Sequence, residues 1–308
     1  MPGAFHRYFS AAALMAILGL FSCGATYTSF RDKTGYDFSN PEKKLTLPDT
    51  LREISGITCT GDHEFACIQD ENGIVFIYDA AKNEIARQYK FHLDGDYEGI
   101  TRKGDTLYIL RSDGVLFEID NYKSENFKTE LYETGIPSGN NEGLCYDAVN
   151  NRLLIACKGK LGKGPEYKDK RAIYAFDLKE KKLSANPVFD FDMQEIRKYC
   201  SEQKLSLPTR SKKNGAIEDP VIRFRPSAIC IHPLTRRLFL LSAADHMLFI
   251  FNMNGGIEHA EVLDPAMFNK AEGITFSENG DALISNEGQE GVPTLLVFPY
   301  KNFEMENK

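Results

Sequence analysis

The chain has 308 residues, of which 42% are hydrophobic and 26% are charged, an ordinary composition for a globular protein. A chain of this length buries a core large enough to fold without disulfides or a structural metal. The net charge is −7, and lysine and arginine form no dense cluster outside one loop, which argues against nucleic-acid binding.

Residues 1–22 are predicted to be a bacterial lipoprotein signal peptide. A weakly basic start precedes an apolar run from Ala11 to Phe21, which is too short to span a bilayer as a helix. The run ends in Leu20-Phe21-Ser22-Cys23-Gly24, which resembles a lipobox with Cys23 as the lipidated residue. An ordinary cleaved signal peptide with a chance cysteine is the alternative. Acylation of Cys23 would anchor the protein in the cell envelope, facing the periplasm or the exterior.

Residues 23–42 are polar and aperiodic, and we interpret them as a flexible tether between the membrane and a folded body. The body is expected to be a single domain over residues 43–300, followed by a short C-terminal tail over 301–308. We expect this body to be a monomer that binds an unknown protein or small-molecule ligand.

A short motif recurs along the body. Its strong copies are Asp96-Tyr97-Glu98-Gly99-Ile100, Asn141-Glu142-Gly143-Leu144 and Ala271-Glu272-Gly273-Ile274, and its weaker copies are Ile54-Ser55-Gly56-Ile57 and Pro226-Ser227-Ala228-Ile229. The spacing is about 44 residues, with one gap about twice as long, and such a period is typical of propellers and solenoids. Within each unit, short apolar runs rich in β-branched and aromatic residues alternate with turn residues, a pattern that predicts four strands per unit.

The repeat therefore predicts an all-β fold, a five-bladed β-propeller. The last unit lacks a fourth strand, and Lys44-Leu45-Thr46-Leu47 is predicted to supply it and close the ring. The long gap leaves six blades as the alternative. However, residues 193–204 look helical and the following residues to 224 are polar, so we interpret 193–224 as an insertion that covers part of one face. A second polar loop, Gly159 to Pro165, interrupts the third unit.

The repeat also brings carboxylates together. The first strand of each propeller blade lines the central channel, so Glu98, Glu142 and Glu272 are predicted to converge there. Three carboxylates at one place need a proton or a cation. Oxygen ligands suit Ca²⁺, and no histidine or cysteine shares the frame, which makes zinc a poor fit. The alternative is a water-filled channel in which the glutamates bond to backbone amides and Lys158. Asp113, Lys158 and Glu287 end second strands and are candidates for an outer shell.

At these motifs the chain resembles the SdiA-regulated family of bacterial envelope propellers. The ordered set of matching segments runs from Ile54-Ser55-Gly56-Ile57-Thr58 to Ile284-Ser285-Asn286-Glu287 and covers roughly residues 45–300. The resemblance implies a five-bladed propeller with a bound calcium ion and no established activity, distantly similar to NHL-repeat and lactonase-type propellers. The chain departs from the family by its insertion at 193–224 and by Ser227-Ala228 in place of Ser-Gly.

Other chemistry is sparse in the sequence. The six cysteines after Cys23 form no CxxC motif and are interpreted as buried free thiols, with Cys59–Cys67 and Cys145–Cys157 pairing as the alternative. His232 and His246 are interpreted as turn or surface residues. Two functions stay open: a binding or scaffold module with calcium at its hub, and a calcium-dependent hydrolase of the lactonase or phosphoesterase type, with catalytic residues unknown.

Overall fold

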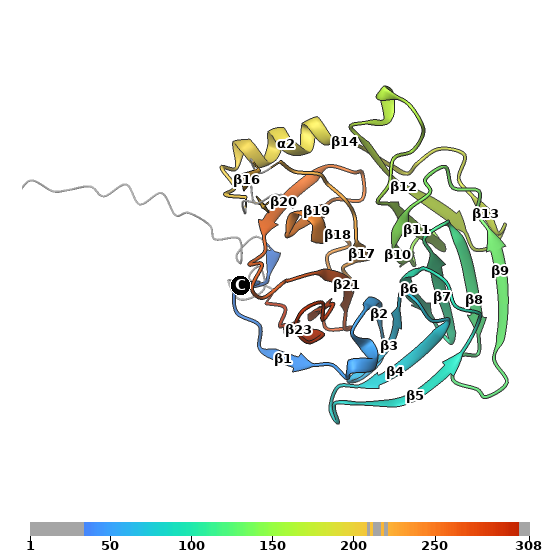
Figure 1. Ribbon diagram of the computed structural model, residues 1–308. Coiled ribbons are helices and arrows are strands. Elements are labelled where there is room, and N and C mark those ends of the chain that lie inside the picture. Colours follow the sequence, from blue (N-terminus) through green and yellow to red (C-terminus); the bar gives the residue numbers. More distant parts are fainter. Residues whose placement is uncertain (1–33, 208–209, 212–216, 219–220, 302–308) are drawn as a thin grey trace, which may run out of the picture.

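The computed structural model describes residues 34–207, 210–211, 217–218 and 221–301, and these residues form a five-bladed β-propeller (Figure 1). The prediction of an all-β propeller with five blades is confirmed, and six blades are excluded. Blade 1 consists of β2 Ile54–Gly61, β3 Glu64–Gln69, β4 Ile74–Asp79 and β5 Glu84–Lys90. Blade 2 consists of β6 Tyr97–Lys103, β7 Thr106–Arg111, β8 Val115–Asp120 and β9 Lys128–Glu133.

The remaining blades repeat this antiparallel order from the hub outward. Blade 3 has β10 Asn141–Asp147, β11 Arg152–Cys157 and β12 Lys170–Asp177, with β13 Lys182–Leu183 and β14 Phe189–Asp192 both paired to β12. Blade 4 has β17 Ala228–Ile231, β18 Leu238–Ser242, β19 Met247–Phe251 and β20 Ile257–Val262. Blade 5 has β21 Ala271–Phe276, β22 Ala282–Asn286, β23 Thr294–Phe298 and β1 Lys43–Thr46.

Burial along the strands explains why these sequences form blades. In the middle strands of a blade, such as β3 and β19, both faces are covered by the adjacent blades. Their side chains are therefore apolar on both faces, and their sequences are continuous hydrophobic runs. The outer strand β5 has one face in solvent and alternates strictly between exposed and half-buried residues. The core consists of apolar layers between adjacent blades.

The ring closes through the two ends of the chain. β1 pairs antiparallel with β23, with Lys43 opposite Val297 and Thr46 opposite Thr294, which confirms the predicted closure. Residues 34–42 also belong to the body: Tyr36 and Phe38 are buried in the same hydrophobic cluster as Phe298. The tether predicted for 23–42 therefore does not extend into these residues. Its other residues, the signal peptide, Cys23 and most of the tail lie outside the described residues.

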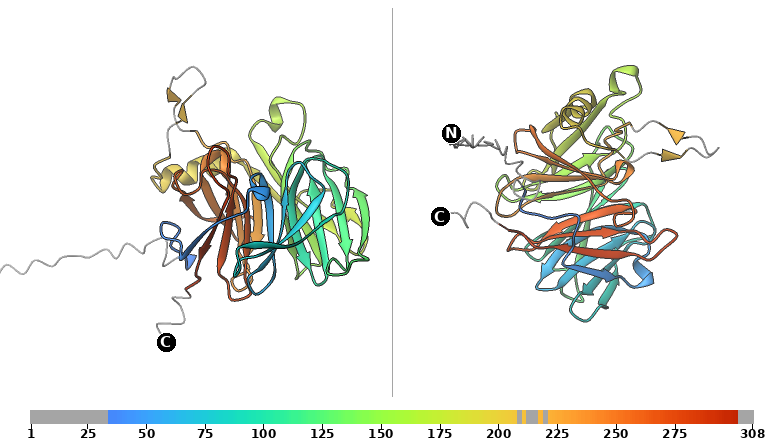
Figure 2. Two further views of the ribbon diagram at one scale, coloured as in Figure 1. Left: turned by 60° about the horizontal axis from the view of Figure 1, so that its bottom comes forward. Right: turned by 90° about the vertical axis from the view of Figure 1, so that its left-hand side faces the viewer.

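The insertion begins with the predicted helix. α2 Met193–Glu202 starts at Asp192, whose carboxylate accepts the Gln194 N–H at 2.8 Å as an N-cap. Its buried residues pack on a cluster that includes Phe224 of the 221–227 segment and Phe249 of blade 4. The short strands β15 Arg210–Ser211 and β16 Ile217–Glu218 pair and project from the body near α2 (Figure 2). No helix in the described ranges is long and apolar enough to cross a membrane.

Side chains join the inner strands to one another. Two residues after each repeat glycine or its equivalent, the chain places Thr58, Thr101, Cys145, Cys230 and Thr275. Thr101 accepts the Tyr146 N–H of the next blade at 3.1 Å, and Thr275 accepts the Cys59 N–H at 3.2 Å across the closure. Cys145 and Cys230 occupy the same position in blades 3 and 4.

This pattern explains the cysteines. All six described cysteines are free, as predicted, and Cys145 and Cys230 stand where blades 1, 2 and 5 have threonine. Cys67 lies opposite Ile57 and Cys157 opposite Asn141, so neither alternative disulfide has facing partners. Burial raises the pKa of the Cys145 thiol well above its ordinary value, which keeps it protonated and unreactive.

Candidate hub site

The repeat motif forms a β-bulge at the hub. In blades 1, 2, 3 and 5 the pairing register shifts just before the repeat glycine. The residue that precedes this glycine has no partner in the ladder. The bulged residues are Ser55, Glu98, Glu142 and Glu272. A bulge adds a local kink that re-aims the side chain. Four equivalent residues are thereby turned toward one region at the start of the inner strands.

The glycine that follows each bulge lets neighbouring inner strands approach closely. A Cβ on Gly99 would lie 2.8 Å from the Glu142 carbonyl oxygen, and one on Gly273 would lie 2.9 Å from Ile57 Cγ2 of β2. Blade 4 has Ala228 at this position, and its ladder begins there without a register shift. The repeated glycine therefore has a packing reason in addition to the geometry of the bulge.

The two serines at this position satisfy the backbone of the next blade. Ser55 Oγ donates to the Tyr97 carbonyl at 2.7 Å, and Ser227 Oγ donates to the Ala271 carbonyl at 2.9 Å. Ser227 Oγ also accepts the Ala243 N–H at 3.2 Å. Serine therefore has a structural role in blades 1 and 4, and the three glutamates supply the ionisable groups in blades 2, 3 and 5.

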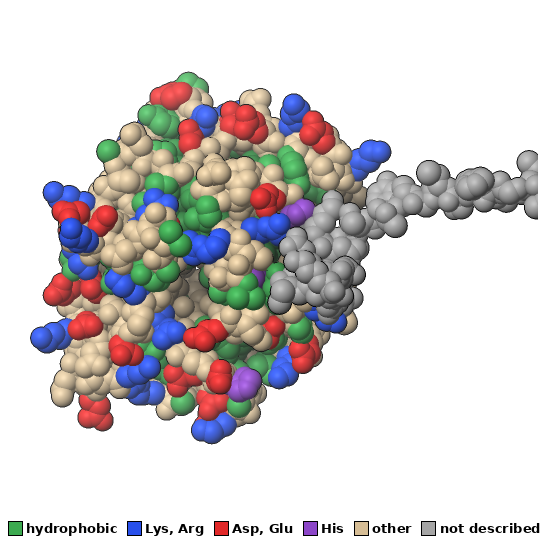
Figure 3. Space-filling model, turned by 180° about the vertical axis from the view of Figure 1, so that it is seen from behind, with side chains coloured by type: hydrophobic (Ala, Val, Ile, Leu, Met, Phe, Trp, Pro, Cys, Tyr) green, Lys and Arg blue, Asp and Glu red, His purple; other side chains and the backbone are tan. Residues whose placement is uncertain are grey.

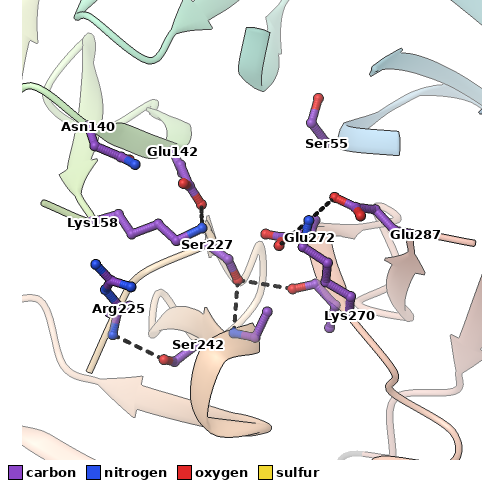
Figure 4. Close-up of polar contacts among 12 residues, drawn as sticks. Ser55, Asn140, Glu142, Lys158, Arg225, Ser227, Ser242, Lys270, Glu272 and Glu287 are labelled. Carbon is purple, nitrogen blue, oxygen red and sulfur yellow. Dashed lines mark hydrogen bonds and ion pairs between the residues drawn. The ribbon is translucent and has the colours of Figure 1, made fainter. Parts of the chain in front are cut away.

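Lysines bind two of the three glutamates (Figure 4). Lys158 forms an ion pair with Glu142, whose side chain is only 4% exposed. Lys270 lies 3.4 Å from Glu272 and forms a second ion pair with Glu287. Glu98 forms no hydrogen bond or ion pair within the described part of the chain. The hub thus contains more carboxylate than ammonium charge.

The pKa values reflect this excess. Burial raises the pKa of Glu98 to about 9; Glu142, Asp96 and Glu272 add to the rise, and Lys158 opposes it. Burial likewise raises the pKa of Glu142 to about 7, against the effect of Lys158. The bulges place Glu98, Glu142 and Glu272 at equivalent positions of three inner strands, and Glu142 adds to the rise in the pKa of Glu98. At neutral pH Glu98 is protonated, and Glu142 is near its midpoint.

The predicted outer shell is only partly assembled. Lys158 and Glu287 lie in the hub, as described above. Asp113 instead turns back onto Arg111 at 2.8 Å, is about half exposed and contacts none of the hub glutamates. Among the described residues, no group of three or more histidine, cysteine, aspartate or glutamate side chains is already arranged as a metal cage.

Sequence reasoning missed several charged residues at this face. Two positions before the bulge, the chain has Glu53, Asp96, Asn140, Arg225 and Lys270. Aligning the repeats two residues further toward the N-terminus would have shown this column. Asp70 follows β3 beside Glu53, and burial together with Glu53 and Glu287 raises the pKa of its carboxyl to about 6. The blade 1 and 5 side of the hub is therefore rich in carboxylates.

A cavity of about 890 Å³ lies at the opposite end of the channel, where the inner strands finish. Its walls include Cys59, Arg102, Tyr146, Cys230 and Phe276, and none of the hub glutamates contributes. On the face seen in Figure 3, acidic and basic side chains are interspersed, and the basic ones form no continuous patch.

The fold and the hub define the class of the protein as a β-propeller. No protein-family model and no curated protein sequence matches the chain. Among solved structures, it is similar to the glutaminyl cyclase of Myxococcus xanthus, with 12% identity and a TM-score of 0.53 over 85% of this chain and 97% of that one. This similarity supports the propeller fold alone.

Two further solved structures are similar at lower scores. A streptogramin B lyase has 12% identity and a TM-score of 0.46, covering 83% of this chain and 97% of that one. A protein of unknown function from Bacteroides thetaiotaomicron has 9% identity and a TM-score of 0.47, covering 80% of this chain and 55% of that one. The resemblance to the SdiA-regulated family in particular stays a prediction.

Proposed function

We propose that the chain is a lipid-anchored propeller of the bacterial envelope, related to the SdiA-regulated family, that binds calcium at its hub and acts as a binding or scaffold module. The observation that supports calcium most is the set of carboxylates on equivalent bulges, with Glu98 unpaired and Glu142 near its titration midpoint. A hard divalent cation relieves this repulsion and takes oxygen ligands.

The donor set fits such an ion in chemistry. Glu98, Glu142 and Glu272 would hold it, and the calcium would neutralise their charge and fix three inner strands relative to one another. Lys158 and Lys270 now neutralise Glu142 and Glu272, so ion binding requires these ammonium groups to turn away. Protons compete for the same oxygens, and calcium affinity should rise as the pH increases from 6 to 9.

Calorimetric titration of metal-depleted protein with calcium tests the proposal. The unsubstituted chain should bind one ion, and the double variant Glu98→Gln, Glu142→Gln should lose at least a hundredfold in affinity. Glu125→Gln, which removes an exposed carboxylate on blade 2, is the matched control and should bind normally. Equal titration of all three proteins would remove the hub from the proposal. Release of a Cys23→Ser variant from the membrane fraction tests the anchor separately.

One observation favours a calcium-dependent hydrolase as the second candidate. Glu142 has a pKa near 7, where a carboxylate works best as a general base, and it lies at a hub lined by further titratable groups. A lactonase or phosphoesterase would use the metal to polarise an oxygen of its substrate. The test is turnover of lactone and phosphoester substrates. Turnover that stops when a chelator is added and is absent in Glu142→Gln would establish this function. No turnover at any pH from 6 to 9 would exclude it.

A further inference from the structure

A buried arginine next to the hub has no carboxylate partner. Arg171 is the second residue of β12, lies opposite Phe191 of β14 and is only 7% exposed. Its Nη1 donates to the Lys170 carbonyl at 2.7 Å, while its buried Nε has no hydrogen-bond partner. A buried guanidinium without a counter-ion is costly, and proteins almost always pair one.

The acids around Arg171 are bound to other groups. Asp169 pairs with Arg197 of α2 at 3.0 Å. Asp245 accepts the N–H groups of Arg223 and Phe224, at 3.0 and 2.8 Å, and the Ser242 hydroxyl at 2.7 Å. Neither carboxylate forms an ion pair with Arg171 in the described part of the chain, although both favour its charged form from a longer distance.

A second cation lies beside it. Arg225 is exposed, its backbone N–H donates to Ser242 Oγ at 3.0 Å, and its guanidinium has no ion-pair partner among the described residues. The ring of Phe191, which lies opposite Arg171, packs against Phe224 with ring centroids 5.2 Å apart, and Phe224 directly precedes Arg225, so the two arginines lie close in the fold. Burial lowers the pKa of Arg171, and repulsion from Arg225 is the next largest cause. Figure 4 shows the Arg225 side chain extending on the side of the hub where Lys158 lies, away from Glu287.

The hub face is therefore polarised. Its blade 3 and 4 side has Arg171, Arg225 and Lys158, and Lys158 neutralises Glu142 there, while Glu98, Glu272 and Glu287 lie on its blade 2 and 5 side. We propose that Arg171 and Arg225 form an oxyanion site, which binds the carboxylate or phosphate group of a small ligand that lies over the mouth of the hub. Two guanidinium forks offer parallel N–H donors to such a group. The site does not depend on calcium.

The test is calorimetric titration of the chain, in metal-free buffer of low ionic strength, with inorganic phosphate and separately with acetate. The proposal predicts saturable binding of at least one anion, weakened tenfold or more by Arg225→Gln and by Arg171→Met. The ratio of phosphate to acetate affinity shows which group the site prefers. Lys128→Gln removes one positive charge from the outer strand β9 and should leave binding unchanged.

Arg225 is exposed, so its variant tests the site without disturbing the core, and circular dichroism checks that Arg171→Met is folded. The inference is overturned if the unsubstituted chain binds neither anion, or if Arg225→Gln binds as tightly as Lys128→Gln. Because the titration contains no calcium, a lack of anion binding says nothing against the calcium site. Likewise, a lack of calcium binding says nothing against the anion site.

Discussion

At the scale of single residues, His232 shows how the fold excludes a charged form. Its ring is fully buried among Tyr36, Phe239, Phe276 and Tyr300. Its Nδ1 accepts the N–H groups of the two turn residues Leu234 and Thr235, both at 3.1 Å, so the proton is on Nε2. Burial lowers the pKa of His232 to about 4.

The pKa of His232 makes stability depend on pH. The neutral ring stabilises the fold fully above its ordinary pKa of 6.5, and this contribution is lost as the pH falls toward 4, because the unfolded chain binds the proton first. The loss should be on the order of 3 kcal/mol between pH 7 and pH 4. Urea unfolding over this range checks it. The slope of stability against pH should flatten in His232→Gln; an unchanged slope would contradict the assignment.

The hub residues show how far sequence can predict a site. Glu98, Glu142 and Glu272 were predictable because equal positions of a repeat meet at the axis. The lysine contacts were less predictable. The position of Lys158 suggested a contact with the glutamates, whereas Lys270 lies outside the repeat motif. Arg171 was not predictable at all, because its lack of a partner depends on how β14, α2 and the 221–227 segment fold over β12. No local pattern encodes such contacts between distant segments.

At the scale of elements, the inner strand combines a bulge with a glycine. The bulge turns the side chain of the residue before the glycine into the hub. Because the glycine has no side chain, the neighbouring strand can pack closely against it. Strand order and closure were predictable from alternating apolar runs and turns. The register shift was not, because a bulge is visible only when the partner strand is known.

Replacing the repeat glycine of an inner strand with alanine should destabilise the blade. A Cβ on Gly273 meets Ser285 Oγ at 2.3 Å and Ile57 Cγ2 at 2.9 Å, so Gly273→Ala should cost about 1–3 kcal/mol through overpacking. Gly139 is the matched control, since a Cβ added there would meet nothing within 4 Å and alanine should be nearly neutral. Denaturant unfolding of both variants measures the difference; equal losses would show that the hub tolerates the methyl group.

At the scale of the whole molecule, the ring holds only if its ends meet. β1 completes blade 5, and Tyr36 packs its ring against His232, Phe239 and Phe276 while its hydroxyl donates to the Gly280 carbonyl. Residues 34–42 are thus part of the fold, although their polar sequence suggested a tether. Tyr36 and Phe38 are buried there, and the Gly35 carbonyl accepts the Lys301 N–H at 2.9 Å.

Removing the closure should destabilise the entire propeller rather than one blade. A chain that starts at residue 48 leaves β23 as a free edge and should unfold at lower denaturant and associate through that edge. A chain that starts at residue 34 keeps β1 and Tyr36 and is the control. Denaturant unfolding and light scattering compare the two. If both chains are equally stable and monomeric, the closure does not hold the ring together.

A crystal structure of the chain grown with calcium, with anomalous data to identify the ion, tests the calcium site most directly. One calcium is expected at the hub, within about 2.3–2.6 Å of oxygens from Glu98, Glu142 and Glu272, with Lys158 and Lys270 turned away. A hub without an ion, in which both lysines still hold Glu142 and Glu272 under saturating calcium, would contradict it.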